Sequence, residues 1–395
     1  MRKIMGLFSD AEMARRLANA QAVMAESNID AIVINSVHNT LYYSGFWMVP
    51  WGRYQGMVIP REGEPAVIAP RIEFDRPHRM SVYDDVRIYW DTKSSVDGIV
   101  KIIGDVLAER GIHGGVIGFE ETFASFEFHS KLLSGLPTFN LRPVAYDLMY
   151  SQKIKSTEEL DIMRHGGQIC DIGAEACVDA LAVGVTEVEL QRVMINAMEK
   201  EICNRFPNEE CDGTFAWFQS GPVNTTVAHA LNTNRKVQKG DILSLNCFPM
   251  IVGYYHLLER SLVMGPISDE VKKYFEIEVE VHHSGISALK PGIRLGDIDD
   301  EYITPIYRRH GLEQARTFGT GHSFGIMHYW FGRDEIGEIR PYNDTILEPG
   351  MVLSIEPMIS IQGVGGFKHA DMFIVHEDSI EQLTNFDNGV IVIDS

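Results

Sequence analysis

The sequence predicts two domains, a small α/β domain over residues 1–152 and an α+β domain over residues 153–395. The chain has 395 residues, which is more than one hydrophobic core of ordinary size organises. Helical and strand patterns alternate in the first third, whereas the remainder combines long amphipathic helices with apolar strand pairs. A new helix-start signal also stands just after the first domain is complete, near residue 150.

The first domain begins with a helix and continues mainly as strands. Ser9 and Glu12 form a capping box ahead of an amphipathic stretch that runs to about residue 30. A second helix is predicted over residues 95–111, where apolar residues recur at helical spacing. The predicted strands are short apolar runs bounded by turn residues, and they cover residues 31–36, 56–60, 66–70, 86–90 and 114–120.

The second domain is predicted to pack long helices on antiparallel hairpins. Capping boxes at Ser156 with Glu159 and at Thr186 with Glu189 start the first two of these helices. The predicted helices cover residues 157–181, 187–202, 268–290 and 295–311. The predicted strands are residues 214–219, a hairpin over 240–265, and a second hairpin that joins 350–361 to 365–377.

Composition excludes several classes of function. The formal net charge of −20 would repel a phosphate backbone, so nucleic acid is not an expected partner. No apolar run approaches the roughly 20 residues of a membrane span, and the first residues lack the pattern of a secretory signal. Five cysteines without a CxxC pair indicate free thiols in a reducing cytoplasm and no zinc site.

Ordered motifs in the second domain carry a resemblance to a known family. The order is "GD" and "GYY" on the first hairpin, then "GTGHSFG", "EPGMVLSIEPM" and "GGF". This order resembles the pita-bread family of methionine aminopeptidase, prolidase and creatinase, and implies that fold for residues 153–395. Family members that use metal hold two cations with Asp, Asp, His, Glu and Glu. The matching positions here are Asn246, Leu257, His322, Glu356 and Ala370.

Three of these five positions therefore carry no carboxylate. One histidine and one glutamate can neither offset four positive charges nor bridge two ions about 3.5–4 Å apart. Within the family, "WFQSG", the segment from Asn39 to Ser44 and "WGR" resemble the metal-free creatinases. The resemblance implies an enzyme without metal or cofactor that hydrolyses the amidino C–N bond of creatine, a linear amidine, to sarcosine and urea.

The expected catalytic residues are His229, Glu259 and Glu356. Side chains alternate along a strand, so Glu259 shares a face with Tyr255 and Leu257, where a metal ligand would project. Paired carboxylates can bind a guanidinium group through N–H···O contacts. His229 matches the creatinase general base, which takes a proton from water and returns it to the departing nitrogen. The alternatives are a structural ion pair for Glu259 with a neighbouring arginine, and a surface histidine for His229.

The resemblance also implies residues that bind the substrate. Arg53 and Arg333 match arginines that hold the substrate carboxylate, and Trp51 and Tyr255 would wall an N-methyl group. His322 is expected to shape the pocket. We therefore expect a small zwitterionic substrate and a cytoplasmic homodimer, in which the segment carrying Arg53 reaches the other subunit's site.

The pocket departs from the creatinase pattern at several points, which leaves the natural substrate open. The loop 227–231 differs, Ala370 replaces an active-site histidine, Trp51 replaces a phenylalanine, and the loop before Gly365 is shorter. One alternative is a sister amidine hydrolase, such as an ectoine hydrolase, and a less favoured one is an Xaa-Pro peptidase-like protein.

Two further alternatives are a nucleophilic Cys247 and a peptide-binding module without activity. Cys247 neighbours Asn246 and so projects to the opposite face of the strand, which argues against a nucleophile in the pocket. Joint presence of His229, both glutamates and both arginines argues against loss of activity.

Overall fold

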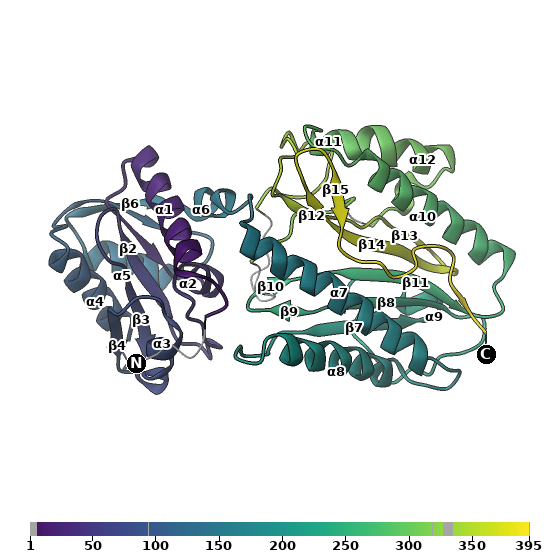
Figure 1. The fold of residues 1–395 in the computed structure, drawn as a ribbon, viewed down its shortest axis with the longest axis horizontal. Helices are drawn as coiled ribbons and strands as arrows, with labels where there is room; N and C mark the ends of the chain where they lie inside the picture. Colours follow the sequence, from purple (N-terminus) through teal and green to yellow (C-terminus); the bar gives the residue numbers. More distant parts are fainter. Residues whose placement is uncertain (1–5, 94, 318, 327–334, 395) are drawn as a thin grey trace. The chain divides into compact units, whose positions relative to one another are not determined.

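The computed structural model of the chain describes residues 6–93, 95–317, 319–326 and 335–394. Its packing divides the chain into two units, Met1–Gln152 and Lys153–Ser395 (Figure 1). The first unit is α/β and the second combines long helices with a mainly antiparallel sheet, as the sequence predicts. None of the described helices is long and apolar enough to cross a membrane.

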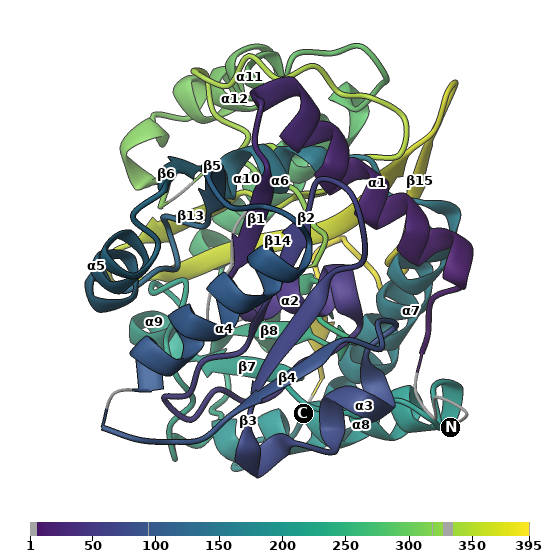
Figure 2. The ribbon, with the colours of Figure 1, turned by 90° about the vertical axis from the view of Figure 1, so that its left-hand side faces the viewer.

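The first unit is built on a six-stranded mixed sheet in the order β4-β3-β2-β1-β5-β6. The strands are β1 (Ala31–Ile34), β2 (Gly56–Pro60), β3 (Ala66–Pro70), β4 (Val86–Tyr89), β5 (Gly115–Phe119) and β6 (Phe139–Pro143). Strands β1, β2 and β3 are buried at every position, which requires cover on both faces. Helices α4 (Ser95–Glu109) and α5 (Phe126–Gly135) pack on one face of this sheet (Figure 2).

The remaining helices of this unit are α1 (Asp10–Ser27), α2 (Val37–Ser44), α3 (Arg76–Met80) and α6 (Ala145–Ser151). The sequence predicts α1 but not α2, α3, α5 or α6. Helix α2 is buried along its whole length, so it has no polar stripe by which an amphipathic pattern could be recognised. Strand β6 lies at the edge of the sheet and is partly exposed, which likewise weakens its apolar signal.

The second unit is built on a sheet whose central order is β12-β14-β11-β8-β7. These strands are β7 (Phe215–Ser220), β8 (Ile242–Phe248), β11 (Leu258–Met264), β12 (Val352–Ile355) and β14 (Gly365–Val375). Shorter strands attach to them or extend the first hairpin: β9 (Met250–Ile251), β10 (Tyr254–Tyr255), β13 (Met358–Ile361), β15 (Ile380–Gln382) and β16 (Val392–Ile393). The two hairpins predicted from the sequence thus meet where β11 pairs with β14.

Long helices cover one face of this sheet. They are α7 (Thr157–Ala180), α8 (Glu187–Arg205) and α10 (Asp269–Ala288), and Figure 1 shows α7 running across the strands. Both predicted capping boxes, at Ser156 and Thr186, are formed. On β8, Cys247 faces the helices, where its Sγ lies 3.8 Å from Sδ of Met194. The alternation of the strand therefore turns Asn246 toward the opposite face.

The single helix predicted over residues 295–311 is wrong in its continuity. The segment consists of α11 (Leu295–Asp297), a π-helical stretch (Ile298–Ile303) and α12 (Thr304–Arg309). Pro305 stands in the first turn of α12 and has no N–H to donate to the preceding turn. The wider π turn before it accommodates this lost bond, so the apolar spacing survives while the hydrogen-bond pattern changes.

Candidate active site

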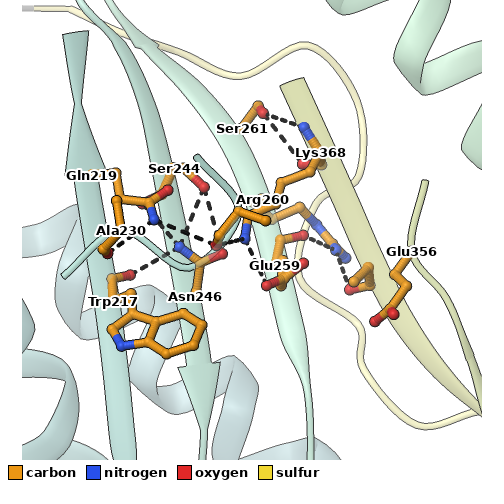
Figure 3. Close-up of polar contacts among 12 residues, drawn as sticks. Trp217, Gln219, Ala230, Ser244, Asn246, Glu259, Arg260, Ser261, Glu356 and Lys368 are labelled. Atoms are coloured by element: carbon orange, nitrogen blue, oxygen red, sulfur yellow. Dashed lines mark hydrogen bonds and ion pairs between the residues drawn. The ribbon is translucent and has the colours of Figure 1, made fainter. Parts of the chain in front are cut away.

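The face of the sheet opposite the long helices carries a buried ion pair. Glu259 of β11 and Lys368 of β14 are 5% and 2% exposed. The ammonium nitrogen of Lys368 donates to Oε1 of Glu259 at 2.7 Å, as Figure 3 shows. In the β11–β14 register Glu259 lies opposite Ala370, so Lys368 is its diagonal neighbour on the same face.

Lys368 is a site residue that sequence reasoning missed. Glu259 does have a basic partner, but that partner is a lysine from a strand about a hundred positions away in the chain. The adjacent Arg260 faces the other side of the sheet, where it binds Asp371 at 2.6 Å. The signal was present in "KHAD", since alternation puts Lys368 on the same face as Ala370.

The positions that match the family's metal ligands do not form a metal site. Asn246 uses its amide nitrogen to donate to the carbonyl of Trp217 at 3.0 Å and to that of Ser244 at 3.2 Å. Leu257 and Ala370 are buried and apolar, and Glu259 already binds an ammonium group. No group of three histidine, cysteine or carboxylate side chains able to hold a metal occurs among the described residues. This donor set does not fit a two-metal centre.

The structure brings together two further predicted residues, His322 and Glu356. Nε2 of His322 lies 3.3 Å from Oε1 of Glu356. Nδ1 of His322 lies 2.9 Å from the carbonyl oxygen of Ser323, which can only accept, so Nδ1 carries a proton. A hydrogen bond between Nε2 and Glu356 therefore needs a second proton, held by either partner. The ring of His322 stacks on Phe324 with centroids 4.7 Å apart.

His229 lies in an exposed turn after the short helix α9 (Gly221–Asn224). Its ring is 5.4 Å from that of Trp217 on β7. From Trp217 a row of rings continues through Phe248 at 5.1 Å and then Phe215 at 4.5 Å. The row ends at Tyr255, 5.8 Å from Phe215. Tyr255 is thus part of an aromatic cluster that reaches His229 at its other end.

The remaining predicted substrate ligands lie elsewhere in the chain. Trp51 and Arg53 belong to the first unit, where Trp51 is 79% exposed at a left-handed backbone position. Nε of Arg53 binds Oδ2 of Asp91 at 2.9 Å in that unit. Arg333 lies outside the described residues.

Cys247 is placed where it cannot act on a substrate in front of the sheet. Its thiol is fully buried against α8, and burial raises its pKa well above the usual value. A nucleophilic cysteine needs the opposite, namely a stabilised thiolate with access to solvent.

Comparison with known proteins agrees with this architecture. Residues 161–377 match metallopeptidase family M24, and residues 16–149 match the creatinase/prolidase N-terminal domain. The chain is 39% identical to a creatinase from Bacillus sp. (strain B-0618) over 391 residues, which cover 98% of this chain and 94% of that protein. It is 28% identical to agropine synthesis cyclase from Rhizobium rhizogenes over 396 residues, covering 96% and 98% of the two chains.

Among solved structures, a prolidase from Thermococcus sibiricus superposes with a TM-score of 0.83 at 24% identity. The match covers 98% of this chain and all of that one (100%). This likeness shows the shared fold. Together with the family match over more than half of the chain, the creatinase match shows that the chain belongs to metallopeptidase family M24, as a creatinase-like hydrolase acting on C–N bonds.

Proposed function

We propose that this protein hydrolyses the amidino C–N bond of creatine to sarcosine and urea without a metal ion. His229 removes a proton from water, whose oxygen adds to the guanidinium carbon. The bond from that carbon to the methylated nitrogen then breaks, His229 returns the proton to this nitrogen, and the hydroxyl proton of the resulting urea cation passes to solvent. Glu259 and Glu356 bind the amidinium end of the substrate.

The observation that carries the metal-free part of the proposal is the buried pair of Lys368 and Glu259. The ammonium group lies 2.7 Å from the carboxylate, on the face where metal-using relatives project their ligands. A divalent ion there would be repelled by a fixed positive charge and would lack the carboxylates of positions 246, 257 and 370. The match to a creatinase over 98% of the chain supports creatine as the substrate.

We further propose a cytoplasmic homodimer with shared active sites. Arg333 and the partner subunit's Arg53 would hold the substrate carboxylate, while Trp51, Tyr255 and His322 shape the pocket.

Urea release from creatine by EDTA-treated protein tests the proposal directly. We expect the chelated and untreated protein to turn over creatine at the same rate, with sarcosine and urea formed in equal amounts. No urea would reject creatine as the substrate, and activity that disappears with EDTA and returns with Mn²⁺ would reject metal independence.

A second candidate is hydrolysis of a cyclic amidine, as in an ectoine hydrolase. Lys368 occupies Oε1 of Glu259, so this carboxylate offers less room for a two-pronged guanidinium contact. A substrate that presents a single N–H there would need only the other oxygen. Product analysis over a panel of creatine, ectoine and related zwitterions separates the two candidates. The Xaa-Pro peptidase alternative is disfavoured because its metal ligands are replaced at Asn246, Leu257 and Ala370.

A further inference from the structure

The turn that carries His229 belongs to a loop with little apolar anchoring. We call residues 220–235, from the last residue of β7 toward β8, the His229 loop; its outgoing arm precedes His229 and its returning arm follows His229. Its large apolar side chains, Val223, Val227 and Leu231, are 76%, 53% and 73% exposed. Packing of these side chains therefore contributes little to fixing the position of the loop. Hydrogen bonds must fix it instead.

One buried carboxylate joins the two arms of this loop. Glu187 is the first residue of α8 and is fully buried. On the outgoing arm, its Oε1 accepts from the backbone N–H of Ser220 at 2.8 Å, the hydroxyl of Ser220 at 2.7 Å and the amide of Asn224 at 2.9 Å. On the returning arm, its Oε2 accepts from the backbone N–H of Thr233 at 2.9 Å and from the Thr233 hydroxyl at 2.7 Å.

The stretch next to His229 is held by a second buried side chain, Gln219 of β7 (Figure 3). Its Nε2 donates to carbonyl oxygens on both sides of His229, those of Val227 at 3.2 Å, Ala228 at 3.5 Å and Ala230 at 3.1 Å. The ammonium group of Lys368 also lies 3.4 Å from the carbonyl oxygen of Ala228. The backbone around His229 is thereby tied to the same face that carries Glu259.

We infer that Glu187 is a positioning residue for His229, which it serves by clamping both arms of the His229 loop; this rests on the proposed role of His229 in hydrolysis. An anion suits this place because it accepts from several donors at once and supplies none. Although burial acts to raise it, hydrogen bonds from Thr233, Ser220 and Asn224 hold the pKa of Glu187 below its usual value.

The substitution Glu187→Gln tests the clamp with little change of shape. Each carboxylate oxygen accepts a backbone N–H, so the new amide NH₂ must oppose that of either Ser220 or Thr233, whichever way it is turned. One arm is then released. Because small displacements of a catalytic group cost up to about 100-fold in rate, we expect kcat to fall roughly 10- to 100-fold while KM changes less than about threefold.

Asp171→Asn is the matched control. Asp171 on α7 accepts from the backbone N–H of Asn385 at 2.9 Å and of Phe386 at 3.0 Å, so it clamps a segment without any predicted site residue. Urea denaturation checks that both variants fold, and we expect only Glu187→Gln to lose kcat. Equal kcat in the two variants would overturn the inference.

Combination with His229→Ala gives a second, independent readout. Rates are measured on whichever compound of the substrate panel the parent protein hydrolyses. If Glu187 acts through His229, then adding Glu187→Gln to His229→Ala leaves the residual rate unchanged. A further fall in the double variant would overturn the inference. Full activity of His229→Ala alone would instead reject the proposed function.

Thr233→Val keeps the test open if Glu187→Gln does not fold. This change keeps the side-chain shape and the backbone N–H but removes the hydroxyl that lies 2.7 Å from Oε2 of Glu187. We expect a several-fold fall in kcat at unchanged KM, and again no effect in the His229→Ala background. Unaltered kcat in Thr233→Val would count against the clamp.

Discussion

The ammonium group of Lys368 lies 2.7 Å from Oε1 of Glu259, and both side chains are buried. The pair joins β11 to β14 in the middle of the sheet. Two opposite charges removed from water stabilise each other only while both are present. The stability of the protein and the charge of its pocket are therefore linked at one contact.

Lys368→Met is expected to lower the free energy of unfolding by about 3–5 kcal/mol, because it leaves the Glu259 carboxylate buried without its cation. Urea denaturation measures this change. The double variant Lys368→Met with Glu259→Gln should recover most of the loss, since no charge then remains buried. Equal stability of the single and double variants would show that the pair is not coupled.

Shared active sites predict complementation between two inactive proteins. Arg53→Ala and His229→Ala homodimers should each be nearly inactive under the proposed mechanism. After unfolding and refolding together, half of the dimers are mixed and each holds one intact site, so activity should return to about a quarter of the parent level. Refolding each variant alone is the control. If the mixture stays inactive, each subunit completes its own site.

Acid is expected to destabilise the protein through buried histidines. Burial lowers the pKa of His256 to about 4 and those of His282 and His369 well below the usual value. Below about pH 6.5 these histidines bind protons in the unfolded chain but stay neutral in the folded chain. The free energy of unfolding therefore falls as pH falls. The loss is at most about 1.4 kcal/mol per pH unit for each histidine.

His256→Asn isolates one of these contributions. The asparagine amide can still donate to the carbonyl of Pro249, which lies 3.2 Å from Nδ1 of His256. Urea denaturation between about pH 7 and about pH 5 should therefore show a slope smaller by up to one proton than that of the parent. An identical slope in the variant would exclude His256 from the acid response.

Glu278 is expected to make the protein less stable as pH rises, which is the opposite of the effect of the buried histidines. Burial raises its pKa to about 8, so the folded protein keeps a proton that the unfolded chain releases above about pH 4.5. Stability from this group is thus lost as pH rises from about 4.5 to 8. Glu278→Gln cannot ionise and still accepts from the Tyr307 hydroxyl, which lies 3.0 Å from Oε2.

The Glu278→Gln variant should be more stable than the parent near pH 9 and similar to it near pH 5, as measured by urea denaturation. Glu276→Gln, at an exposed position on the same helix where its carboxylate faces Lys272, is the control and should show no such difference between the two pH values. A gain of equal size at both pH values would point to packing rather than ionisation.

Cys247→Ala is expected to keep kcat and KM, because the thiol lies on the helix side of the sheet against Met194. A small loss of stability is expected from the cavity, on the order of 1 kcal/mol. Steady-state kinetics and urea denaturation measure the two effects separately. A large loss of kcat in a folded variant would reopen nucleophilic catalysis.

Local patterns predicted most of the elements of both units. The capping boxes at Ser156 and Thr186 and the alternation in β8 and β11 depend on neighbours a few residues apart, which a sequence displays directly. Helix α2 was not predicted because it is buried on all sides and so shows no alternation of polar and apolar faces. The π-helical turn was not predicted because a single proline changes the hydrogen bonding without changing the apolar spacing.

The site was predicted less completely because its contacts are long-range. Glu259 and Glu356 stand in recognisable motifs. The partner of Glu259 is Lys368 on β14, which neither motif contains. Glu187 and Gln219 were missed for the same reason. Each stands in an ordinary helix or strand pattern, and its importance depends on a loop whose path the chain determines only after folding.

The back-to-back placement of Glu259 and Arg260 restricts how this lineage can vary. Inserting or deleting one residue in β11 would exchange them, so a guanidinium would enter the pocket and a carboxylate would replace the partner of Asp371 beneath α10. Both faces of the sheet would lose their buried ion pair in one step. New substrate preferences in such a strand must therefore arise by replacing side chains in place, and relatives should align through it without gaps.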